Sequence, residues 1–101
     1  MGFVVINTVR TTAADLPGIL AEVHALGIDM LRSQEGFKSA RLITAEDQTE
    51  AALIMEWESR DHFVAYRQSP GGKRMIERAA ALHPQINFYD VVVGLDGAAS
   101  A

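Results

Sequence analysis

Four segments of the chain are rich in the β-branched and aromatic residues that are typical of β-strands. The first covers residues 2–10, which hold phenylalanine, valine, isoleucine and threonine without a helix-breaking residue. Residues 37–45 and 51–58 repeat the pattern, and the polar residues 46–49 between them predict a hairpin turn. The fourth segment covers residues 86–93. The sequence therefore predicts four strands, two of which form a hairpin.

One long segment carries apolar residues at helical spacing. Leucine, isoleucine, valine and methionine recur from Leu16 to Leu31, and two threonine hydroxyls precede them as candidate N-caps. Pro17 suits the first turn of a helix, where a missing amide proton costs no hydrogen bond. Gly27 weakens a helix by about 1 kcal/mol relative to alanine. We therefore expect one amphipathic helix, which ends at Gly36.

A second, interrupted helix is expected between the third and fourth strands. Ser59 offers a capping hydroxyl, and Asp61 follows in the first turn, where the positive end of the helix dipole favours an acid. This helix is expected to run to about Ser69. Residues 70–72, with the sequence Pro-Gly-Gly, predict a break, after which a short helix resumes over residues 73–82.

The predicted order of elements is β-α-β-β-α-β, with the second helix broken. This is the order of a ferredoxin-like α+β fold, in which an antiparallel sheet carries its helices on one face. A chain of 101 residues has room for one such domain, which we expect over residues 1–94. Residues 95–101 are expected to form a flexible C-terminal tail of mostly small residues.

Both faces of the predicted sheet are apolar, although its helices can cover only one. In the first strand Phe3, Val5 and Val9 share one face, while Val4 and Ile6 share the other. The sheet of a monomer would alternate apolar with polar residues. The uncovered face predicts packing on a second copy of the chain, as a homodimer. The alternative is a face that merely carries scattered surface hydrophobic residues.

Composition and charge exclude several classes of function. The chain has no cysteine, which removes disulfides, thiolate metal sites and cysteine nucleophiles. Its three histidines lie on separate segments, so no metal site is expected. A net charge of −4 argues against nucleic-acid binding. Apolar runs fall far short of the ~20 residues that cross a bilayer, and no signal-peptide pattern is present, so a cytoplasmic protein without a membrane partner is expected.

Asn7 is a polar residue in an otherwise apolar row. It shares the strand face of Phe3, Val5 and Val9, where an amide costs about 1–3 kcal/mol unless it finds hydrogen-bond partners. Either neighbouring backbone groups satisfy this amide, or it holds an oxygen atom of a substrate in the crevice between sheet and helices. The sequence leaves both interpretations open.

Further candidate chemistry lies on and beside the second helix. His62 and Tyr66 share a helix face four residues apart and could act together on a proton, although an exposed helical histidine is the commoner case. Trp57 is expected mainly in the core, with an indole N–H that can also donate to a ligand. Residues 60–78 hold five basic side chains against two acidic ones. They would either attract an anionic ligand or form a solvated face.

Three short motifs follow one another along the chain: Glu35-Gly-Phe-Lys-Ser-Ala-Arg-Leu, then Ala-Leu-Ile-Met-Glu-Trp57-Glu-Ser-Arg-Asp-His-Phe, and then Tyr66-Arg-Gln-Ser-Pro. Together they resemble the antibiotic biosynthesis monooxygenase domain family, over nearly the whole chain. The resemblance implies a ferredoxin-like domain whose sheet packs on that of a second copy, as a dimeric α+β barrel. It thus agrees with the fold and the homodimer predicted from the hydrophobic pattern.

The resemblance also implies an activity, namely oxidation of a phenolic or quinol-type aromatic molecule by molecular oxygen, without a metal, flavin or haem cofactor. Some members of the family cleave haem instead. Their asparagine, tryptophan and histidine positions fall here on Asn7, Tyr66 and Ile76, which disfavours haem degradation. In the polyketide-oxidising branch, the asparagine and tyrosine positions fall on Leu53 and Phe63. A non-catalytic ligand-binding or accessory domain of the same fold is therefore the alternative.

The expected site lies in the crevice between the sheet and the first two helices. Asn7 would hold the substrate oxygen, and His62, or Tyr66 in its absence, would help to remove the phenolic proton. Apolar walls would protect the reacting oxygen species from water. Four side chains would pack against the aromatic rings of the substrate: Trp57, Phe63, Met30 and Leu42.

Overall fold

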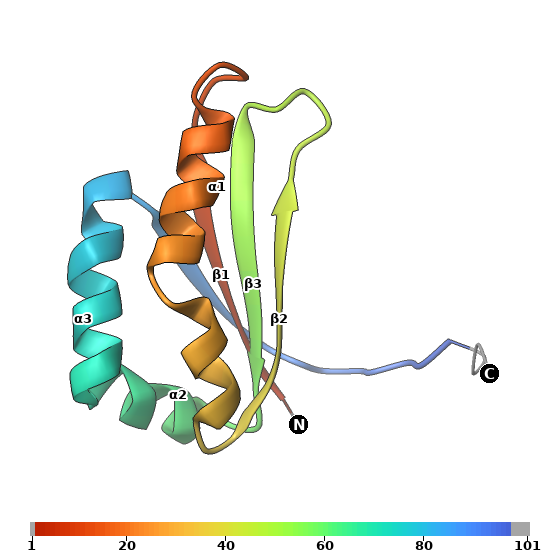
Figure 1. Cartoon of the computed structure of the whole chain (residues 1–101). Helices are drawn as coiled ribbons and strands as arrows, with labels where there is room; N and C mark the ends of the chain where they lie inside the picture. Colours follow the sequence, from red (N-terminus) through yellow and green to blue (C-terminus); the bar gives the residue numbers. More distant parts are fainter. Residues whose placement is uncertain (1, 98–101) are drawn as a thin grey trace.

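A four-stranded antiparallel sheet forms one layer of the protein, and helices form the other (Figure 1). The computed structural model describes residues 2–97. The strands lie in the order β2-β3-β1-β4, which confirms the predicted ferredoxin-like α+β fold. Their bounds are β1 Phe3–Arg10, β2 Phe37–Thr44, β3 Glu50–Trp57 and β4 Gln85–Asp90.

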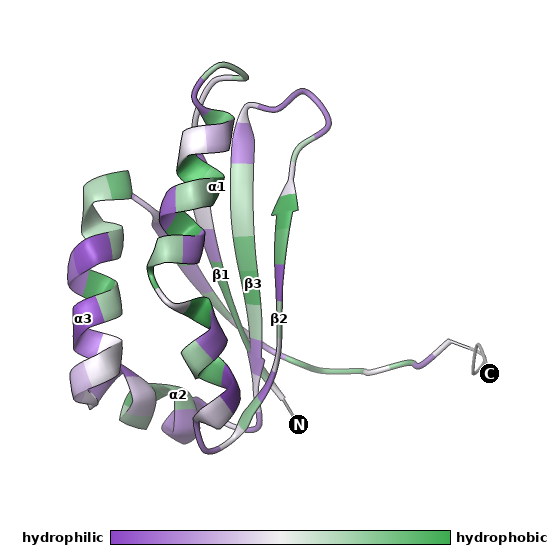
Figure 2. Cartoon of the chain, viewed as in Figure 1, coloured by the Kyte–Doolittle hydropathy of each residue, from purple (hydrophilic) through white to green (hydrophobic). Residues whose placement is uncertain are grey.

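The helices cover one face of this sheet and lie in front of it in Figure 1. Along the described part of the chain, none of them is long and apolar enough to span a bilayer. Figure 2 shows hydrophilic and hydrophobic residues alternating along α3, as one face turns toward the sheet and the other toward solvent. The helices are α1 Leu16–Ala25, η1 Ile28–Ser33, α2 Arg60–Gln68, α3 Pro70–Ala79 and η2 Ala80–Leu82, where η denotes a 3-10 helix.

The first helical segment breaks earlier than its hydrophobic pattern predicts. The helix α1 ends at Ala25, Gly27 takes a left-handed φ of 82°, and the chain continues as the 3-10 helix η1. The expectation of one helix up to Gly36 is therefore wrong. Glycine enters the left-handed region at little steric cost, so Gly27 ends α1 instead of only weakening it.

The break between α2 and α3 is confined to one residue. The Ser69 hydroxyl donates to the carbonyl oxygen of Tyr66 at 2.6 Å and accepts from the amide of Gly72 at 3.1 Å. This serine therefore caps α3 directly after α2 ends. Residues 70–72, which were expected to form the break, instead make the first turn of α3, because a proline there has no amide hydrogen bond to lose.

The core lies between the sheet and the helices, around Trp57. Its indole is 0 % exposed, and the rings of Phe37, Phe63 and Tyr66 surround it at centroid distances of 5.2–5.9 Å. Aromatic pairs at such distances stabilise a fold beyond the burial of their area. The strand that carries Trp57 is thereby anchored to α2.

The opposite face of the sheet, which we call the outer face, carries apolar side chains without helices over them. Since Phe3 and Val5 point to the core, Val4 and Ile6 of the same strand point away from it. Residues that are paired across neighbouring strands share a face, so the pairing identifies the residues of the other strands that lie on the outer face. The apolar members are Val4, Ile6, Ile43, Ala52, Ile54 and Tyr89.

The strand β4 ends at Asp90, three residues before its predicted end at Val93. The chain then runs as an extended segment away from the body of the molecule (Figure 1). In it Val92, Val93 and Leu95 are 81, 72 and 91 % exposed. The tail expected over residues 95–101 begins in this segment, and its residues 98–101 lie outside the described part.

Candidate functional site

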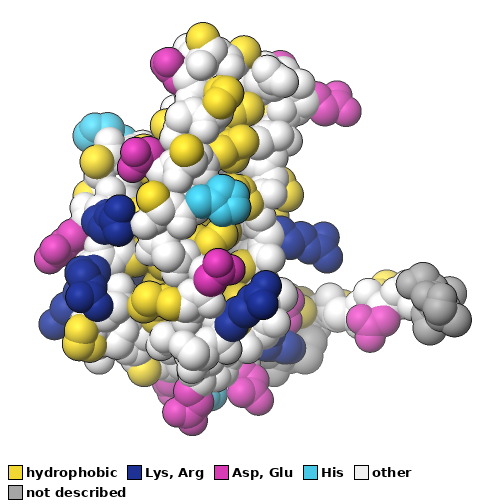
Figure 3. Space-filling view, in the orientation of Figure 1, with side chains coloured by type: hydrophobic (Ala, Val, Ile, Leu, Met, Phe, Trp, Pro, Cys, Tyr) yellow, Lys and Arg dark blue, Asp and Glu magenta, His cyan; other side chains and the backbone are white. Residues whose placement is uncertain are grey.

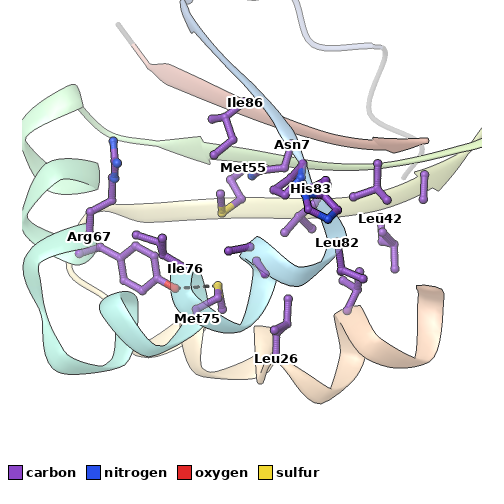
Figure 4. Close-up of a pocket in the computed structure, with 18 of the residues that line it drawn as sticks. Asn7, Leu26, Leu42, Met55, Arg67, Met75, Ile76, Leu82, His83 and Ile86 are labelled. Atoms are coloured by element: carbon purple, nitrogen blue, oxygen red, sulfur yellow. Dashed lines mark hydrogen bonds between the residues drawn. The ribbon is translucent and has the colours of Figure 1, made fainter. Parts of the chain in front are cut away.

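A cavity of about 410 Å³ lies between the sheet and the helices. All four strands contribute to one wall, and α1, α2, α3 and η2 contribute to the other (Figure 4). Its volume falls within the range of about 300–1,000 Å³ that is usual for small-molecule sites. Most of the lining is apolar, with the side chains of Leu26, Leu42, Met55, Met75, Ile76 and Ile86 labelled in Figure 4.

Asn7 is the polar residue on the sheet wall of this cavity. Strand pairing places it between Leu53 of β3 and Ile86 of β4, both of which also line the cavity. Within residues 2–97 its side chain takes part in no hydrogen bond. The sequence left open whether neighbouring backbone groups satisfy this amide, and the structure shows that they do not. The amide is available to a ligand in the cavity.

Tyr66 lines the same cavity, but its hydroxyl is already engaged. The hydroxyl donates to the sulfur atom of Met75, with the oxygen and sulfur 2.9 Å apart (Figure 4). Burial raises the pKa of Tyr66 from 10.0 to about 12. At neutral pH the phenol keeps its proton, so it is suited to hydrogen bonding and not to accepting a proton from a substrate.

His62 does not line the cavity, contrary to the expectation that it shares a site with Asn7. Its Nδ1 atom lies 2.7 Å from the hydroxyl oxygen of Ser59, and its backbone amide donates to that same oxygen at 3.2 Å. On its other side, the imidazole packs so closely on Gly36 that a Cβ atom at this glycine would collide with it. His62 thus belongs to the N-terminal cap of α2.

Of the four residues expected to pack the substrate rings, the structure brings two to the cavity. Phe63 and Leu42 line it, whereas Trp57 and Met30 do not. Trp57 is a core residue, as the sequence allowed, and its Nε1 is buried without a hydrogen-bond partner among the described residues. Met30 is half-buried against the core, with its methyl group beside Gly71.

Two polar side chains on the cavity wall, Arg67 and His83, were not identified as site residues from the sequence. Arg67 projects from α2, and its guanidinium carbon lies 5.6 Å from the centroid of the Phe63 ring. His83 follows η2 with a left-handed φ of 52°. The only sequence signal for Arg67 was its place among the basic residues of 60–78, and His83 was marked only by its position directly after the helix predicted over residues 73–82.

Basic side chains gather over α3 in the space-filling view (Figure 3). They come from Lys73, Arg74 and Arg78, and none of these lines the cavity, which leaves Arg67 as the arginine on its wall. Within residues 2–97 no cluster of three or more histidine and acidic side chains is arranged to hold a metal ion.

Comparison with known proteins gives one family and many similar structures. The family model described as antibiotic biosynthesis monooxygenase matches residues 2–78. No curated protein matches the sequence. Rv0793 from Mycobacterium tuberculosis is similar in structure, with a TM-score of 0.73 and 20 % identity over 98 % of this chain and 100 % of that one.

Two further solved structures are similar in fold. A monooxygenase from the gene ActVA-Orf6 of Streptomyces coelicolor, solved in complex with nanaomycin D, has a TM-score of 0.72 and 24 % identity over 96 % of this chain and 93 % of that one. A dimeric ferredoxin-like protein of unknown function from Jannaschia sp. CCS1 has a TM-score of 0.72 and 11 % identity over 90 % of this chain and 100 % of that one. At these identities the likeness shows the fold.

Proposed function

The chain belongs to the antibiotic biosynthesis monooxygenase family, and from this premise we propose that it oxidises a phenolic or quinol-type aromatic molecule with molecular oxygen. The observation that carries the proposal is the amide of Asn7, which lies on the wall of an apolar cavity and has no hydrogen-bond partner within residues 2–97. Apolar walls with a few polar groups suit a flat aromatic molecule that has an oxygen to be held.

In this proposal Asn7 donates a hydrogen bond to the substrate oxygen and stabilises the negative charge that develops when the phenol loses its proton. The phenolate then passes one electron to O₂, and the resulting superoxide and carbon radical combine as a peroxide anion, which takes back the phenolic proton to become a hydroperoxide. Loss of water leaves a carbonyl group, so one oxygen atom enters the product and the other leaves as water. No metal, flavin or haem takes part.

We assign the proton-accepting role to His83, because it lines the cavity and His62 does not. Imidazole is the side chain best suited to accept a phenolic proton near neutral pH. Tyr66 has a structural role in this proposal. Its ring forms part of the cavity wall, and its hydroxyl holds the side chain of Met75 in place. Phe63 and Leu42 pack against the rings of the substrate.

Oxygen consumption by metal-stripped protein with hydroquinones, naphthols and anthrones tests the proposal. We expect Asn7→Ala to lower the rate by about 100-fold, as loss of a charge-stabilising donor does elsewhere. Gln68→Ala, which removes an exposed amide on α2 away from the cavity, should keep the rate. His83→Gln should lower the rate near pH 7 and recover it at higher pH, where the phenol ionises unaided.

Two results would contradict the proposal. If Asn7→Ala consumed oxygen at the unaltered rate, the amide would have no part in the reaction. If phenols bound in the cavity and no oxygen were consumed with any of them, the non-catalytic ligand-binding domain would be the better description. The absence of catalysis would then be explained by Leu53 and Phe63, which stand where the resemblance implied asparagine and tyrosine.

We also propose that the protein is a homodimer that packs through the outer face. The outer face presents apolar side chains from all four strands on the side that no helix covers. A second copy related by a two-fold axis would bury the same residues on both chains. The dimeric ferredoxin-like protein of the same fold supports this assembly.

A further inference from the structure

The cavity differs in charge from the protein that contains it. The chain has thirteen acidic and nine basic side chains, with a net charge of −4. Among the described residues, however, no aspartate or glutamate lines the cavity, whereas Arg67 and His83 do. A smaller hollow of about 50 Å³ shares Phe63, Arg67 and Phe88 with the cavity and adds Arg60. The end of the cavity at which Arg67 and Arg60 lie is therefore positive.

Arg67 lines the cavity, and its guanidinium is free to bind. Its guanidinium stacks over the Phe63 ring at 5.6 Å, an arrangement that holds the planar group while its N–H donors remain available. Neither Arg67 nor Arg60 has a carboxylate partner in the described part of the chain, where the salt bridge formed is that of Lys38 with Glu56. Guanidinium donors in this state match the two oxygens of a carboxylate.

Figure 4 shows Arg67 at the α2 end of the cavity, well apart from Asn7 and His83. The apolar residues Met55, Met75 and Ile76 lie between these two ends. A ligand that reaches both ends thus meets polar groups at each end and an apolar wall between them. The two polar ends would fix the direction in which the ring system lies.

We propose that the substrate is an aromatic acid, whose carboxylate pairs with Arg67 while its phenolic oxygen lies at Asn7. The inference rests on the proposed function, since it concerns the same cavity. The inference also assigns roles to the basic residues of 60–78, for which the sequence left an anionic ligand and a solvated face as alternatives. Arg67 serves an anionic ligand, and the basic residues of α3 form a solvated face. Arg60, from the adjoining hollow, adds to the positive field at the carboxylate.

The test uses two probes that differ only at the acid group, 6-hydroxy-2-naphthoic acid and its methyl ester, in which the hydroxyl and the acid group lie at opposite ends of the ring system. Isothermal titration calorimetry without oxygen measures the Kd of both, so that no turnover interferes. We expect the wild-type protein to bind the acid about tenfold more tightly than the ester, as a hydrogen-bonded charge pair at a partly exposed site would give. Arg67→Gln should bind the two probes equally.

Two more variants separate the ion pair from other effects. Arg67→Lys keeps the charge but loses the two-pronged geometry, and should therefore retain a reduced preference for the acid. Arg74→Gln removes an exposed arginine that does not line the cavity, and should retain the full preference. Binding of the ester by Arg67→Gln with the wild-type Kd shows that this variant has kept its cavity.

Equal affinity of the wild-type protein for acid and ester would overturn the inference, as would an acid preference that persists in Arg67→Gln. Failure of both probes to bind at millimolar concentration would overturn it too. An acid preference that is lost in Arg67→Gln supports the inference even if no phenol ever consumes oxygen. In that case only the proposed oxygenase activity fails.

Discussion

Two polar side chains of the cavity wall, Tyr66 and Asn7, differ in whether they form a hydrogen bond within the protein. Tyr66 donates to the sulfur of Met75 and is buried, so its polar group contributes to the stability of the fold. The amide of Asn7 has no such partner in the part of the chain that the structure describes. We therefore expect substitution of Tyr66 to change stability first, and substitution of Asn7 to change the chemistry of the cavity.

The raised pKa of Tyr66 predicts a loss of stability in alkaline solution. The unfolded phenol ionises near pH 10 and the folded one at about 12, so the stabilisation is complete below pH 10 and is lost as the pH rises toward 12. Over this window the free energy of unfolding should fall by up to about 1.4 kcal/mol per pH unit. Urea denaturation at pH 8 to 12 measures it.

In Tyr66→Phe this fall should disappear, at a cost of about 0.5–1.5 kcal/mol at neutral pH for the lost hydrogen bond. Tyr89→Phe is the matched control, because it removes a phenol that is 49 % exposed and should leave the alkaline fall unchanged. An alkaline fall of the same size in the wild type and in Tyr66→Phe would show that another group causes it.

Within the helices, two glycines predict opposite effects of the same substitution. A Cβ atom at Gly72, in the first turn of α3, would collide with the backbone carbonyl group of Tyr66. A Cβ atom at Gly18, in α1, would meet no heavy atom within 4 Å. The capped junction between α2 and α3 thus requires glycine at position 72, whereas α1 tolerates any good helix former at position 18.

We expect Gly72→Ala to lower the free energy of unfolding by about 1–3 kcal/mol, because the two helices must move apart. Gly18→Ala should raise it by about 0.5–1 kcal/mol, since alanine has the higher helix propensity. Chemical denaturation of both variants measures the difference. Equal effects at the two positions would contradict the close packing of α3 on the end of α2.

For the molecule as a whole, the outer face predicts how two copies assemble. Ile54 lies near its centre, paired with Ile6 on one side and Arg41 on the other. A charge there would be buried in the proposed dimer without a partner, which is strongly unfavourable. We expect Ile54→Lys to be a monomer by light scattering during size-exclusion chromatography, while the wild-type protein is a dimer.

Ala65→Lys is the control for this experiment, since it places the same charge on the exposed surface of α2, and the dimer should persist. A wild-type protein that is monomeric at micromolar concentration would contradict the proposed assembly. The apolar residues of the outer face would then be surface residues only, which is the alternative that the sequence had left open.

The positions of the strands and helices could be predicted from the sequence because they depend on neighbours along the chain. The β-branched and aromatic residues of 3–9 placed β1, and the cap at Ser59 placed the start of α2. The resemblance of the motifs around Trp57 agreed with the family that the comparison shows. The end of α1 could not be predicted, because glycine is compatible both with a helix and with the left-handed turn at Gly27.

Membership of the cavity was decided by tertiary structure alone. Asn7 was found from the sequence because it interrupts an apolar row. Trp57 and His62 were expected beside it. Instead, Trp57 packs among aromatic rings in the core, and His62 is part of the N-terminal cap of α2. Arg67 and His83 line one cavity although they are 16 positions apart in the sequence, and no local sequence pattern indicates this. A cavity wall is built from long-range contacts, which only the folded chain brings together.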